Sequence, residues 1–488
     1  MTLKSVKFLL KQTMKKGSFF ITTTIPYVNA EPHIGFALEL VQSDAIARYY
    51  RLLGRDVFFS TGTDEYGQKI WEASQKEGKD IQAYVDHYAQ KFSELKKLLN
   101  LSNDNFIRTT SKEHIKAAQE FWHLCNRRGD IYRKIYRGLY CVGCEKFITE
   151  KDLMDGKCSI HPNKMPEIIE EENYFFRLSK YKEELLKYLS SEGVIIPEWR
   201  RIEALDFVKE GMEDFSISRD KKRFSWGIPI PEDDTQVMYV WFGAFVNYIS
   251  TLGWPNSKGV FEKFWSEGET VQTAGKDMVK FQSVMWQGML MSADLPTTDK
   301  IIYHGFITGE GGIKMSKSLG NVVNPNEIVQ EYGTDALRYF LLREISPFED
   351  SPFTMERFKE AYNANLANGL GNLVSRILTM AETYGVDHLG LFPIFKDNSN
   401  LNNFDIKKYM DEIWEKIQIL DKKVQEKEPY KIFKTDHNFA MSIVSNLCSD
   451  LSIVANMLIP VMPKTAEKIS EYIRAFKKPS QPLFPRKE

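Results

Sequence analysis

The sequence predicts an α/β protein in which a parallel-sheet domain is split by an insertion and followed by an all-α domain. Strand-like and helical segments alternate near the start of the chain and again after residue 226. The stretch between them is rich in turn signals and holds three of the five cysteines. After about residue 349, apolar residues recur with helical spacing almost to the end of the chain.

The composition is that of a folded protein without a membrane span. A length of 488 residues corresponds to about three domains. Lys plus Arg is 65 and Asp plus Glu is 66, so the net charge of −1 excludes a uniformly basic surface for nucleic acid, but not a local basic patch. The longest apolar run, Leu451 to Met462, is interrupted by Ser452, Asn456 and Pro460, whereas a membrane helix needs about 20 apolar residues.

Residues 1–17 form a basic N-terminal extension with five lysines and no acidic residue. An amphipathic targeting segment is one interpretation. We favour a short extension, or an upstream start codon with the native start at Met14.

Residues 18–128 are the expected first half of the sheet domain. Phe19–Thr24 is rich in β-branched and aromatic residues and predicts a strand. A helical pattern over Ile34–Leu52 leads to a second strand at Val57–Phe59, and this order is typical of a parallel sheet. A further helix near 112–127 is opened by a capping pattern.

Residues 129–225 are the expected insertion, and its cysteines predict a metal site. Cys141 and Cys144 are followed by Cys158 and His161 in a CxxC and CxxH pattern. Four such ligands are typical of a closed, tetrahedral and therefore structural zinc site, with one ion. The alternative is a set of unligated thiols. Cys125 and Cys448 are isolated, and we interpret both as buried thiols.

Residues 226–348 resume the α/β pattern, with a helix expected at 275–291 and a strand at 301–303. Residues 349–488 are expected to be helical apart from a polar loop at 396–403.

Two segments have the chemistry of phosphate binding. Pro32-His33-Ile34-Gly35-Phe36 lies where the first strand leads into a helix, whose free N–H groups favour an anion. The segment from Gly311 to Asn321 places two lysines and two hydroxyls between glycines, which suits a loop closing over a polyphosphate. Taken singly, His33 could be a helix cap and the second segment a solvated basic loop.

Together the two segments resemble the HIGH and KMSKS signatures of the class I aminoacyl-tRNA synthetases. The resemblance extends from Phe19 to the C-terminus and is closest to the methionyl-tRNA synthetase family. It implies a Rossmann-like catalytic domain, a zinc-binding insertion facing the tRNA acceptor stem, and an anticodon-binding helical bundle. The matching segments are Ile25-Pro26-Tyr27-Val28-Asn29, Thr61-Gly62-Thr63-Asp64-Glu65, Trp226-Gly227-Ile228-Pro229, Tyr239-Val240-Trp241, Gly275-Lys276-Asp277 and Lys314-Met315-Ser316-Lys317-Ser318.

The resemblance implies ATP-dependent activation of L-methionine, with Mg²⁺ on the phosphates, and transfer to the 2′-OH of the 3′-terminal adenosine of tRNA(Met). The catalytic residues it implies are His33, Lys314 and Lys317. These three also belong to the implied ATP site, together with Asn29, Gly35, Asp277 and Ser316. The implied methionine site comprises Ile25, Tyr27, Asp64, Trp241, Ala244, Tyr248, Phe281, Gln282 and Trp286. The implied anticodon site comprises Asn372, Arg376 and Tyr430.

Each of these sets has an alternative interpretation from the residues alone. Asp64 could cap the turn that follows it. The aromatic residues could be ordinary core, and Asn372 with Arg376 could be a solvated helix face.

Four positions depart from the family pattern. Phe36 replaces the second histidine of the signature, which removes a donor to the phosphates. Gln282 replaces a histidine facing the thioether but can still donate a hydrogen bond. Gly243 replaces a common Asp beside the pocket. Tyr430 replaces a Trp, which keeps a stacking face and loses the indole N–H.

Three other functions agree less well with the sequence. The leucine, isoleucine and valine enzymes carry a large editing domain, and residues 129–225 are too few for it. A non-catalytic tRNA-binding paralogue would need a damaged ATP site, which Phe36 alone does not make. A nucleotidyl transferase acting without tRNA has no use for a long helical domain. We expect a cytoplasmic monomer that does not bind membranes, because reduced cysteines fit the cytoplasm and the chain ends soon after the helical domain.

Overall fold

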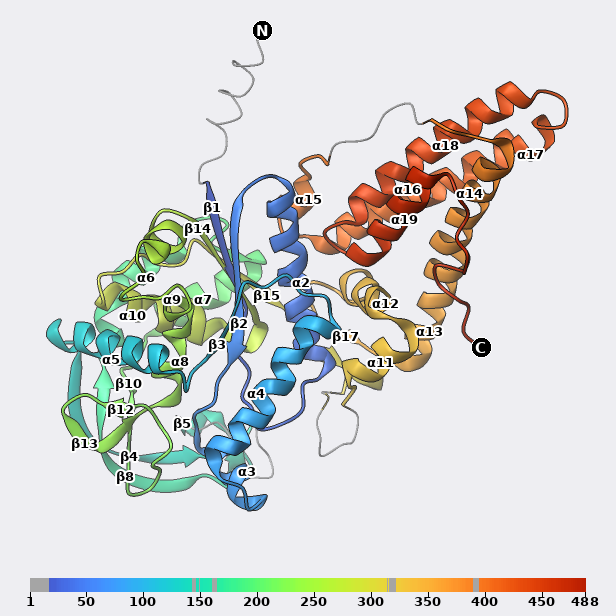
Figure 1. Ribbon diagram of the computed structural model, residues 1–488. Helices are drawn as coiled ribbons and strands as arrows, with labels where there is room; N and C mark the ends of the chain where they lie inside the picture. The colour runs from blue at the N-terminus through green and yellow to red at the C-terminus, as the bar shows by residue number, and fades with distance from the viewer. Residues whose placement is uncertain are drawn as a thin grey trace, which may run out of the picture. The chain divides into compact units, whose positions relative to one another are not determined.

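The computed structural model describes residues 17–142, 146–148, 150–159, 165–313, 315, 322–388 and 395–488 (Figure 1). They form two compact units. Unit 1 comprises the described residues up to Pro32, together with 57–94 and 103–303. Unit 2 comprises 33–56, 95–102 and 304–488. Each unit is described by itself.

Unit 1 is built on a six-stranded sheet, which confirms the predicted parallel α/β core. β1 pairs in parallel with β14, β2 with β3, and β15 with β9. All five residues of β1 are buried, as in a sheet covered on both faces. The strand order is β3 (Asn105–Arg108), β2 (Asp56–Thr63), β1 (Ser18–Thr22), β14 (Glu269–Gly275), β15 (Lys300–His304) and β9 (Ile195–Ile196).

In unit 1, one helix starts at its predicted cap, whereas another predicted helix is divided into shorter pieces. α5 (Lys112–Arg127) starts where the capping pattern indicates, because the hydroxyl of Ser111 accepts a hydrogen bond from the N–H of His114. The helix expected over 275–291 is instead three pieces: a 3₁₀ turn at Lys276–Met278, a π-helical stretch at Phe281–Met285, and α10 (Trp286–Ser292). The other helices include α3 (Gln68–Lys76), α4 (Ile81–Leu98), α8 (Val240–Phe245) and α9 (Asn247–Ser250).

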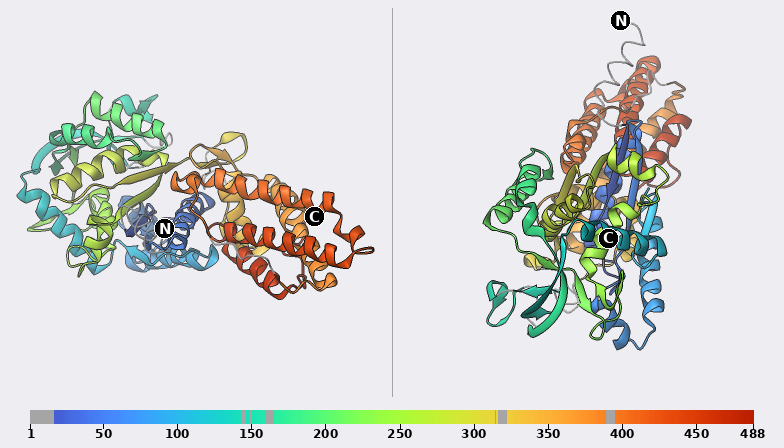
Figure 2. Two further views of the ribbon diagram at one scale, coloured as in Figure 1. Left: turned by 90° about the horizontal axis from the view of Figure 1, so that it is seen from above. Right: turned by 90° about the vertical axis from the view of Figure 1, so that its left-hand side faces the viewer.

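The range predicted as an insertion forms a second sheet in the order β10-β8-β4-β5. β4 (Ile131–Cys141) and β8 (Glu167–Phe176) make its long antiparallel pair (Figure 2). The same range also supplies β9 to the edge of the main sheet, so the structural separation is less clean than the sequence suggested. The remaining elements are β5 (Lys146–Ile148), β6 (Leu153–Met154), β7 (Lys157–Cys158), α6 (Lys182–Leu189), α7 (Glu198–Glu210), β10 (Phe215–Ser216), β11 (Ser218–Asp220), β12 (Pro229–Ile230) and β13 (Asp233–Met238).

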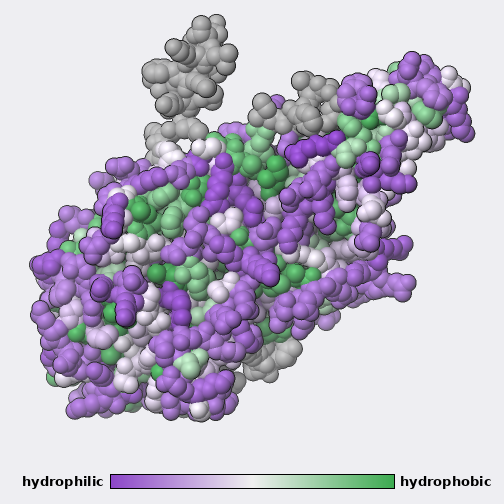
Figure 3. Space-filling model, in the orientation of Figure 1, coloured by the Kyte–Doolittle hydropathy of each residue, from purple (hydrophilic) through white to green (hydrophobic). Residues whose placement is uncertain are grey.

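Unit 2 is mainly helical, as predicted for the C-terminal part of the chain. α18 (His437–Leu458) packs against α14, α16 and α19. By length and composition α18 alone among the described helices could cross a membrane, but half of its apolar window is buried in the structure. Hydrophilic residues predominate on the face shown in Figure 3. The other elements are α2 (Ile34–Leu52), β16 (Ile307–Thr308), α11 (Pro325–Tyr332), α12 (Thr334–Tyr339), β17 (Ser351–Pro352), α13 (Met355–Ala361), α14 (Asn372–Tyr384), α15 (Ser399–Asn402), α16 (Ile406–Lys427), α17 (Pro429–Ile432) and α19 (Pro463–Ala475).

Candidate active site

The carboxyl ends of neighbouring parallel strands carry several of the predicted site residues of unit 1. Tyr27 and Asn29 follow β1, Asp64 follows β2, and Asp277 follows β14. Hydrogen bonds cross-link these strand ends, since the hydroxyl of Thr23 donates to that of Thr61 at 2.7 Å. Ligands of open α/β sheets bind at this edge. Asn29 and Asp277 are exposed there.

The backbone of Asp64 is fixed from both sides. Its N–H donates to the Pro26 carbonyl at 2.9 Å, and its own carbonyl accepts from the Val28 N–H at 3.2 Å. The buried carboxylate accepts from the Tyr66 N–H and from the Thr109 hydroxyl, both at 3.4 Å. The turn-capping alternative is therefore real, but bonds of this length are weak.

Aromatic residues predicted for the methionine site form one continuous cluster. Trp241 and Phe281 stack with their ring centroids 4.4 Å apart, and Tyr27 meets Trp241 edge-on at 6.4 Å. Behind them, Trp286 is fully buried and packs against Tyr248 at 5.8 Å. Trp286 and Tyr248 therefore belong to the hydrophobic core, as the alternative interpretation has it. Tyr27, Trp241 and Phe281 are only half-buried, so they form the accessible edge of the cluster.

Smaller residues complete this region. Ala244 is buried and Ile25 is half-buried. Gln282 is fully buried, and its side-chain amide donates to the Tyr248 hydroxyl at 3.2 Å. At Gly243 a Cβ would lie 2.9 Å from the Cδ1 of Ile228, the far end of a flexible side chain, so a larger residue would require only that Ile228 shift.

In unit 2, His33 is the N-cap of α2. Its Nδ1 accepts a hydrogen bond from the Gly35 N–H at 3.1 Å, which confirms the capping alternative for this residue. The same bond fixes the tautomer: in the neutral ring the proton must then be on Nε2. His33 is exposed. Phe36 is half-buried and its N–H donates to the His33 carbonyl at 3.0 Å.

The predicted phosphate loop is described only at its flanks, because Lys314, Ser316 and Lys317 lie outside the described residues. Before it, Gly311 and Gly312 both have positive φ, +68° and +77°, which favours glycine. After it, the carbonyl of Val323 accepts from the Ile34 N–H at 3.0 Å. The chain leaving the loop is thus hydrogen-bonded to the first turn of the helix that His33 caps.

Comparison with known proteins decides the family. A model of the class I tRNA synthetases (M) matches residues 19–160 and 148–378. The methionine–tRNA ligase of Thermotoga maritima is 40% identical over 484 residues, which is 95% of this chain and 76% of that protein. That of Clostridium acetobutylicum is 41% identical over 477 residues, or 93% of this chain and 73% of that protein. The chain belongs to the class I methionyl-tRNA synthetase family.

A solved structure agrees with this assignment. The methionyl-tRNA synthetase of Mycobacterium tuberculosis in complex with methionyl-adenylate is similar to this chain with a TM-score of 0.87 and 33% identity. The similarity covers 96% of this chain and 100% of that one.

The helical region holds the positions that resemble the anticodon site of the methionyl-tRNA synthetases. Asn372 is exposed at the start of α14. One turn later, Arg376 donates from Nη1 to the carboxylate of Asp421 on α16 at 2.6 Å. Tyr430 on α17 is 47% exposed, which leaves a ring face for stacking. Arg376 is therefore held in one orientation rather than simply solvated.

The insertion brings two of the predicted zinc ligands together. Cys141, at the end of β4, and Cys158, on β7, are both buried in one small cluster with Ile148. Cys144 and His161 lie outside the described residues. Among the described residues, no group of three or more His, Cys, Asp or Glu could hold a metal. Cys125 and Cys448 are buried as predicted, and burial raises the pKa of each thiol to about 12.

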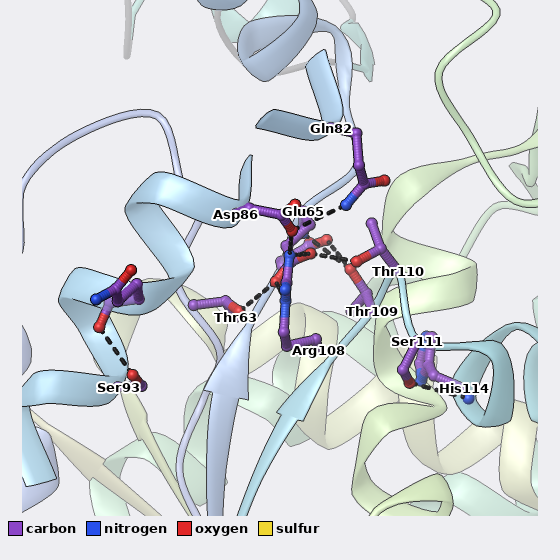
Figure 4. Close-up of polar contacts among 12 residues, drawn as sticks. Thr63, Glu65, Gln82, Asp86, Ser93, Arg108, Thr109, Thr110, Ser111 and His114 are labelled. Carbon is purple, nitrogen blue, oxygen red and sulfur yellow. Dashed lines mark hydrogen bonds and ion pairs between the residues drawn. The ribbon is translucent and has the colours of Figure 1, made fainter. Parts of the chain in front are cut away.

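Sequence reasoning missed Glu65, which follows Asp64 directly. Its carboxylate is fully buried and bonded to Arg108 in a polar cluster at the ends of β2 and β3 (Figure 4). The only signal in the sequence was an acid beside Asp64 and an arginine at the end of the next predicted strand.

Proposed function

We propose that this protein is a methionine–tRNA ligase that activates L-methionine with ATP and transfers it to tRNA(Met). The observation that carries the proposal is the similarity to methionine–tRNA ligases over at least 93% of the chain. The site agrees with it, because a buried acid follows β2 in the unit that also holds a half-buried aromatic edge.

The substrate chemistry suits these side chains. Asp64 binds the ammonium of methionine, and the aromatic edge of Tyr27, Trp241 and Phe281 receives the polarizable thioether. Gln282 is fixed by a hydrogen bond to the Tyr248 hydroxyl in the buried part of the cluster. The methionine carboxylate is ionised at neutral pH, so it attacks the α-phosphate of ATP without a general base, forming methionyl-adenylate and releasing pyrophosphate. Catalysis then depends on positioning and on stabilising charge on the phosphates.

His33, Lys314 and Lys317 are assigned to the charge on the phosphates. The Nε2–H of His33 donates to a phosphate oxygen while Nδ1 remains bonded to Gly35. Lys314 and Lys317 supply positive charge from the loop that follows Ile313, and Ser316 adds a hydroxyl. Asn29 and Asp277 contact the nucleotide. Mg²⁺, when bound, would neutralise part of the charge on the phosphates. Phe36 leaves His33 as the sole histidine of the signature segment.

Transfer of the methionyl group requires tRNA, and Arg376 provides a test of how it binds. We expect Arg376→Ala to raise the KM for tRNA(Met) in aminoacylation by about tenfold or more, because contacts to an unpaired base contribute about 1–3 kcal/mol. Steady-state aminoacylation measures this. Methionine-dependent ATP–pyrophosphate exchange needs no tRNA and reports whether the activating site of the variant is intact. An unchanged KM for tRNA would contradict the proposed role of Arg376.

One structural zinc ion would be held by Cys141, Cys144, Cys158 and His161. The fit is supported by the shared burial of Cys141 and Cys158 in one cluster. The ion would stabilise the insertion and take no part in the reaction, since four protein ligands leave no open position.

Zinc analysis tests this site directly. The purified protein should contain about one zinc per chain, and Cys158→Ser should lower that content several-fold because one thiolate ligand is lost. Mass spectrometry of the metal after dialysis gives the number. Cys448→Ser, at a buried thiol of α18, is the matched control and should keep its zinc. Zinc-free wild-type protein, or equal zinc in both variants, would exclude the assignment.

We also propose that the protein is a monomer, that it is located in the cytoplasm and that it binds no membrane. A sedimentation mass near twice 56.7 kDa would contradict the monomer.

Amino-acid-dependent ATP–pyrophosphate exchange with all twenty amino acids tests the proposed function. Exchange with methionine alone is the expected result. Exchange with another amino acid would mean that the pocket accepts a different substrate. Binding of tRNA without any exchange would favour a non-catalytic paralogue instead.

A further inference from the structure

The carboxylate of Glu65 is saturated by its neighbours in unit 1. One oxygen, Oε1, accepts from the Thr63 hydroxyl at 2.7 Å and from Nε of Arg108 at 2.6 Å. The other, Oε2, accepts from Nη2 of Arg108 at 2.8 Å and from the Thr110 hydroxyl. A carboxylate has about four acceptor sites. All of them are occupied, so Glu65 has no acceptor left for a substrate ammonium.

The backbone of Glu65 is held as tightly as its side chain. Its N–H donates to the Thr109 hydroxyl at 2.8 Å, and the same hydroxyl is the donor to the Asp64 carboxylate. Its carbonyl accepts from the indole N–H of Trp226 at 2.7 Å. Every polar group of Glu65 therefore helps to fix the turn that presents Asp64.

Arg108 joins this turn to two other elements. It is the last residue of β3 and lies opposite Thr63, the last residue of β2. Its guanidinium extends between Glu65 and Asp86 of α4, with Nη2 2.5 Å from the Asp86 carboxylate (Figure 4). Hydrogen bonding to Glu65, and then to Asp86, raises the pKa of Arg108 above its ordinary value, so the guanidinium remains charged.

The charges explain why two adjacent acids can have different roles. Glu65 is fully buried and would repel the neighbouring Asp64 carboxylate if it were not neutralised. The bidentate ion pair with Arg108 supplies that neutralisation. Asp64 is the acid that the proposed function assigns to the substrate cation, and its carboxylate shares the Thr109 hydroxyl with the Glu65 N–H.

We propose that Glu65 and Arg108 are positioning residues for methionine: their ion pair orients the Asp64 carboxylate toward the substrate ammonium. This inference rests on the proposed function. The pair contacts no substrate, and it acts through the turn at Asp64.

Glu65→Gln tests the inference in ATP–pyrophosphate exchange. The amide keeps the shape but places N–H donors against the donors of Arg108 and Thr110, so the turn loses its fixed geometry. We expect the KM for methionine to rise about tenfold, equivalent to about 1.4 kcal/mol, while the KM for ATP changes less than about twofold. A merely structural role would raise both KM values and lower the thermal midpoint together.

A pair of substitutions at Arg108 gives an independent measurement, which also decides the matter if Glu65→Gln does not fold. Arg108→Lys keeps the charge and loses the bidentate geometry, whereas Arg108→Met loses both. The KM for methionine should increase in the order wild type, Arg108→Lys, Arg108→Met.

The matched control is Glu198→Gln on α7. Glu198 also makes a bidentate pair, with Nε of Arg201 2.9 Å from one carboxylate oxygen and Nη2 2.5 Å from the other, and the Glu198 side chain is exposed. Both KM values should be unchanged in that variant. Equal effects of Glu65→Gln on the two KM values, or no order among the Arg108 variants, would overturn the inference alone. Wild-type protein without methionine-dependent exchange would overturn the proposed function, and this inference with it.

Discussion

Asp64→Asn is expected to lower kcat/KM for methionine in ATP–pyrophosphate exchange by about 10²–10³-fold. The substitution removes the negative charge opposite the substrate ammonium in a buried site, and breaking such a pair costs about 3–5 kcal/mol. Each factor of ten corresponds to about 1.4 kcal/mol. The KM for ATP should change little, because Asp64 is assigned to the amino acid alone. Exchange kinetics with each substrate varied in turn measure both effects.

The fold should survive this substitution. The bonds that fix Asp64 to Pro26 and Val28 involve only its backbone, so asparagine can keep them. Asp206→Asn, an exposed residue on α7, is the control for the chemical change itself. A variant with normal methionine kinetics would show that another residue binds the ammonium, and an equal loss for ATP would show that the turn supports both substrates.

The sequence predicted those parts of the fold that have strong local signals. The helices expected at Ile34–Leu52 and 112–127 match α2 and α5, because both combine apolar residues at helical spacing with a capping residue at the start. β9 was not predicted, because the two residues Ile195–Ile196 are too few to show the alternation of apolar and polar residues that indicates a strand. The π-helical stretch at Phe281–Met285 was missed because apolar spacing does not distinguish its hydrogen bonding from that of an α-helix.

In the candidate site, too, the sequence predicted some features and could not predict others. Residue chemistry alone left the roles of His33 and Asp64 open, and the resemblance to a family chose between them. At His33 the structure shows the helix cap, because Nδ1 accepts from the Gly35 N–H, while the role toward a ligand stays a prediction. Glu65 and Arg108 are 43 positions apart and meet only because β2 and β3 pair in parallel. No local pattern carries that information.

Loss of the buried ion pair between Asp44 and Arg338 is expected to have the largest effect on stability in unit 2. Both side chains are fully buried, and Nη1 of Arg338 lies 2.8 Å from Oδ2 of Asp44. Arg338→Met should lower the free energy of unfolding by about 3–5 kcal/mol, because the buried Asp44 carboxylate loses one of its two arginine partners and three buried carbonyls lose their donor. Urea unfolding followed by circular dichroism measures the loss.

The surroundings of the pair explain why a single substitution is so costly. Arg338 also donates to three backbone carbonyls, those of Val461 at 2.8 Å and of Pro460 and Leu99 at 3.2 Å. Methionine fills much of the volume but leaves these acceptors without their donor. Arg48 and Ser102 still contact Asp44 and keep part of its charge compensated. A loss below about 1 kcal/mol, typical of an exposed pair, would contradict this account.

The pH dependence of stability separates the charge of Asp44 from the packing of Arg338. Burial raises the pKa of Asp44. Arg338, Arg48 and Ser102 together lower it by more than burial raises it, so the pKa in the folded protein lies below its usual value. The folded state therefore binds this proton less readily than the unfolded state, so the stability from Asp44 is present above about pH 4 and is lost as pH falls through the folded pKa. Arg338→Met removes the strongest of the lowering charges. Its stability should therefore fall less steeply with acid than that of the wild type. Parallel slopes for the two proteins would assign the whole effect of the substitution to packing and to the three carbonyls.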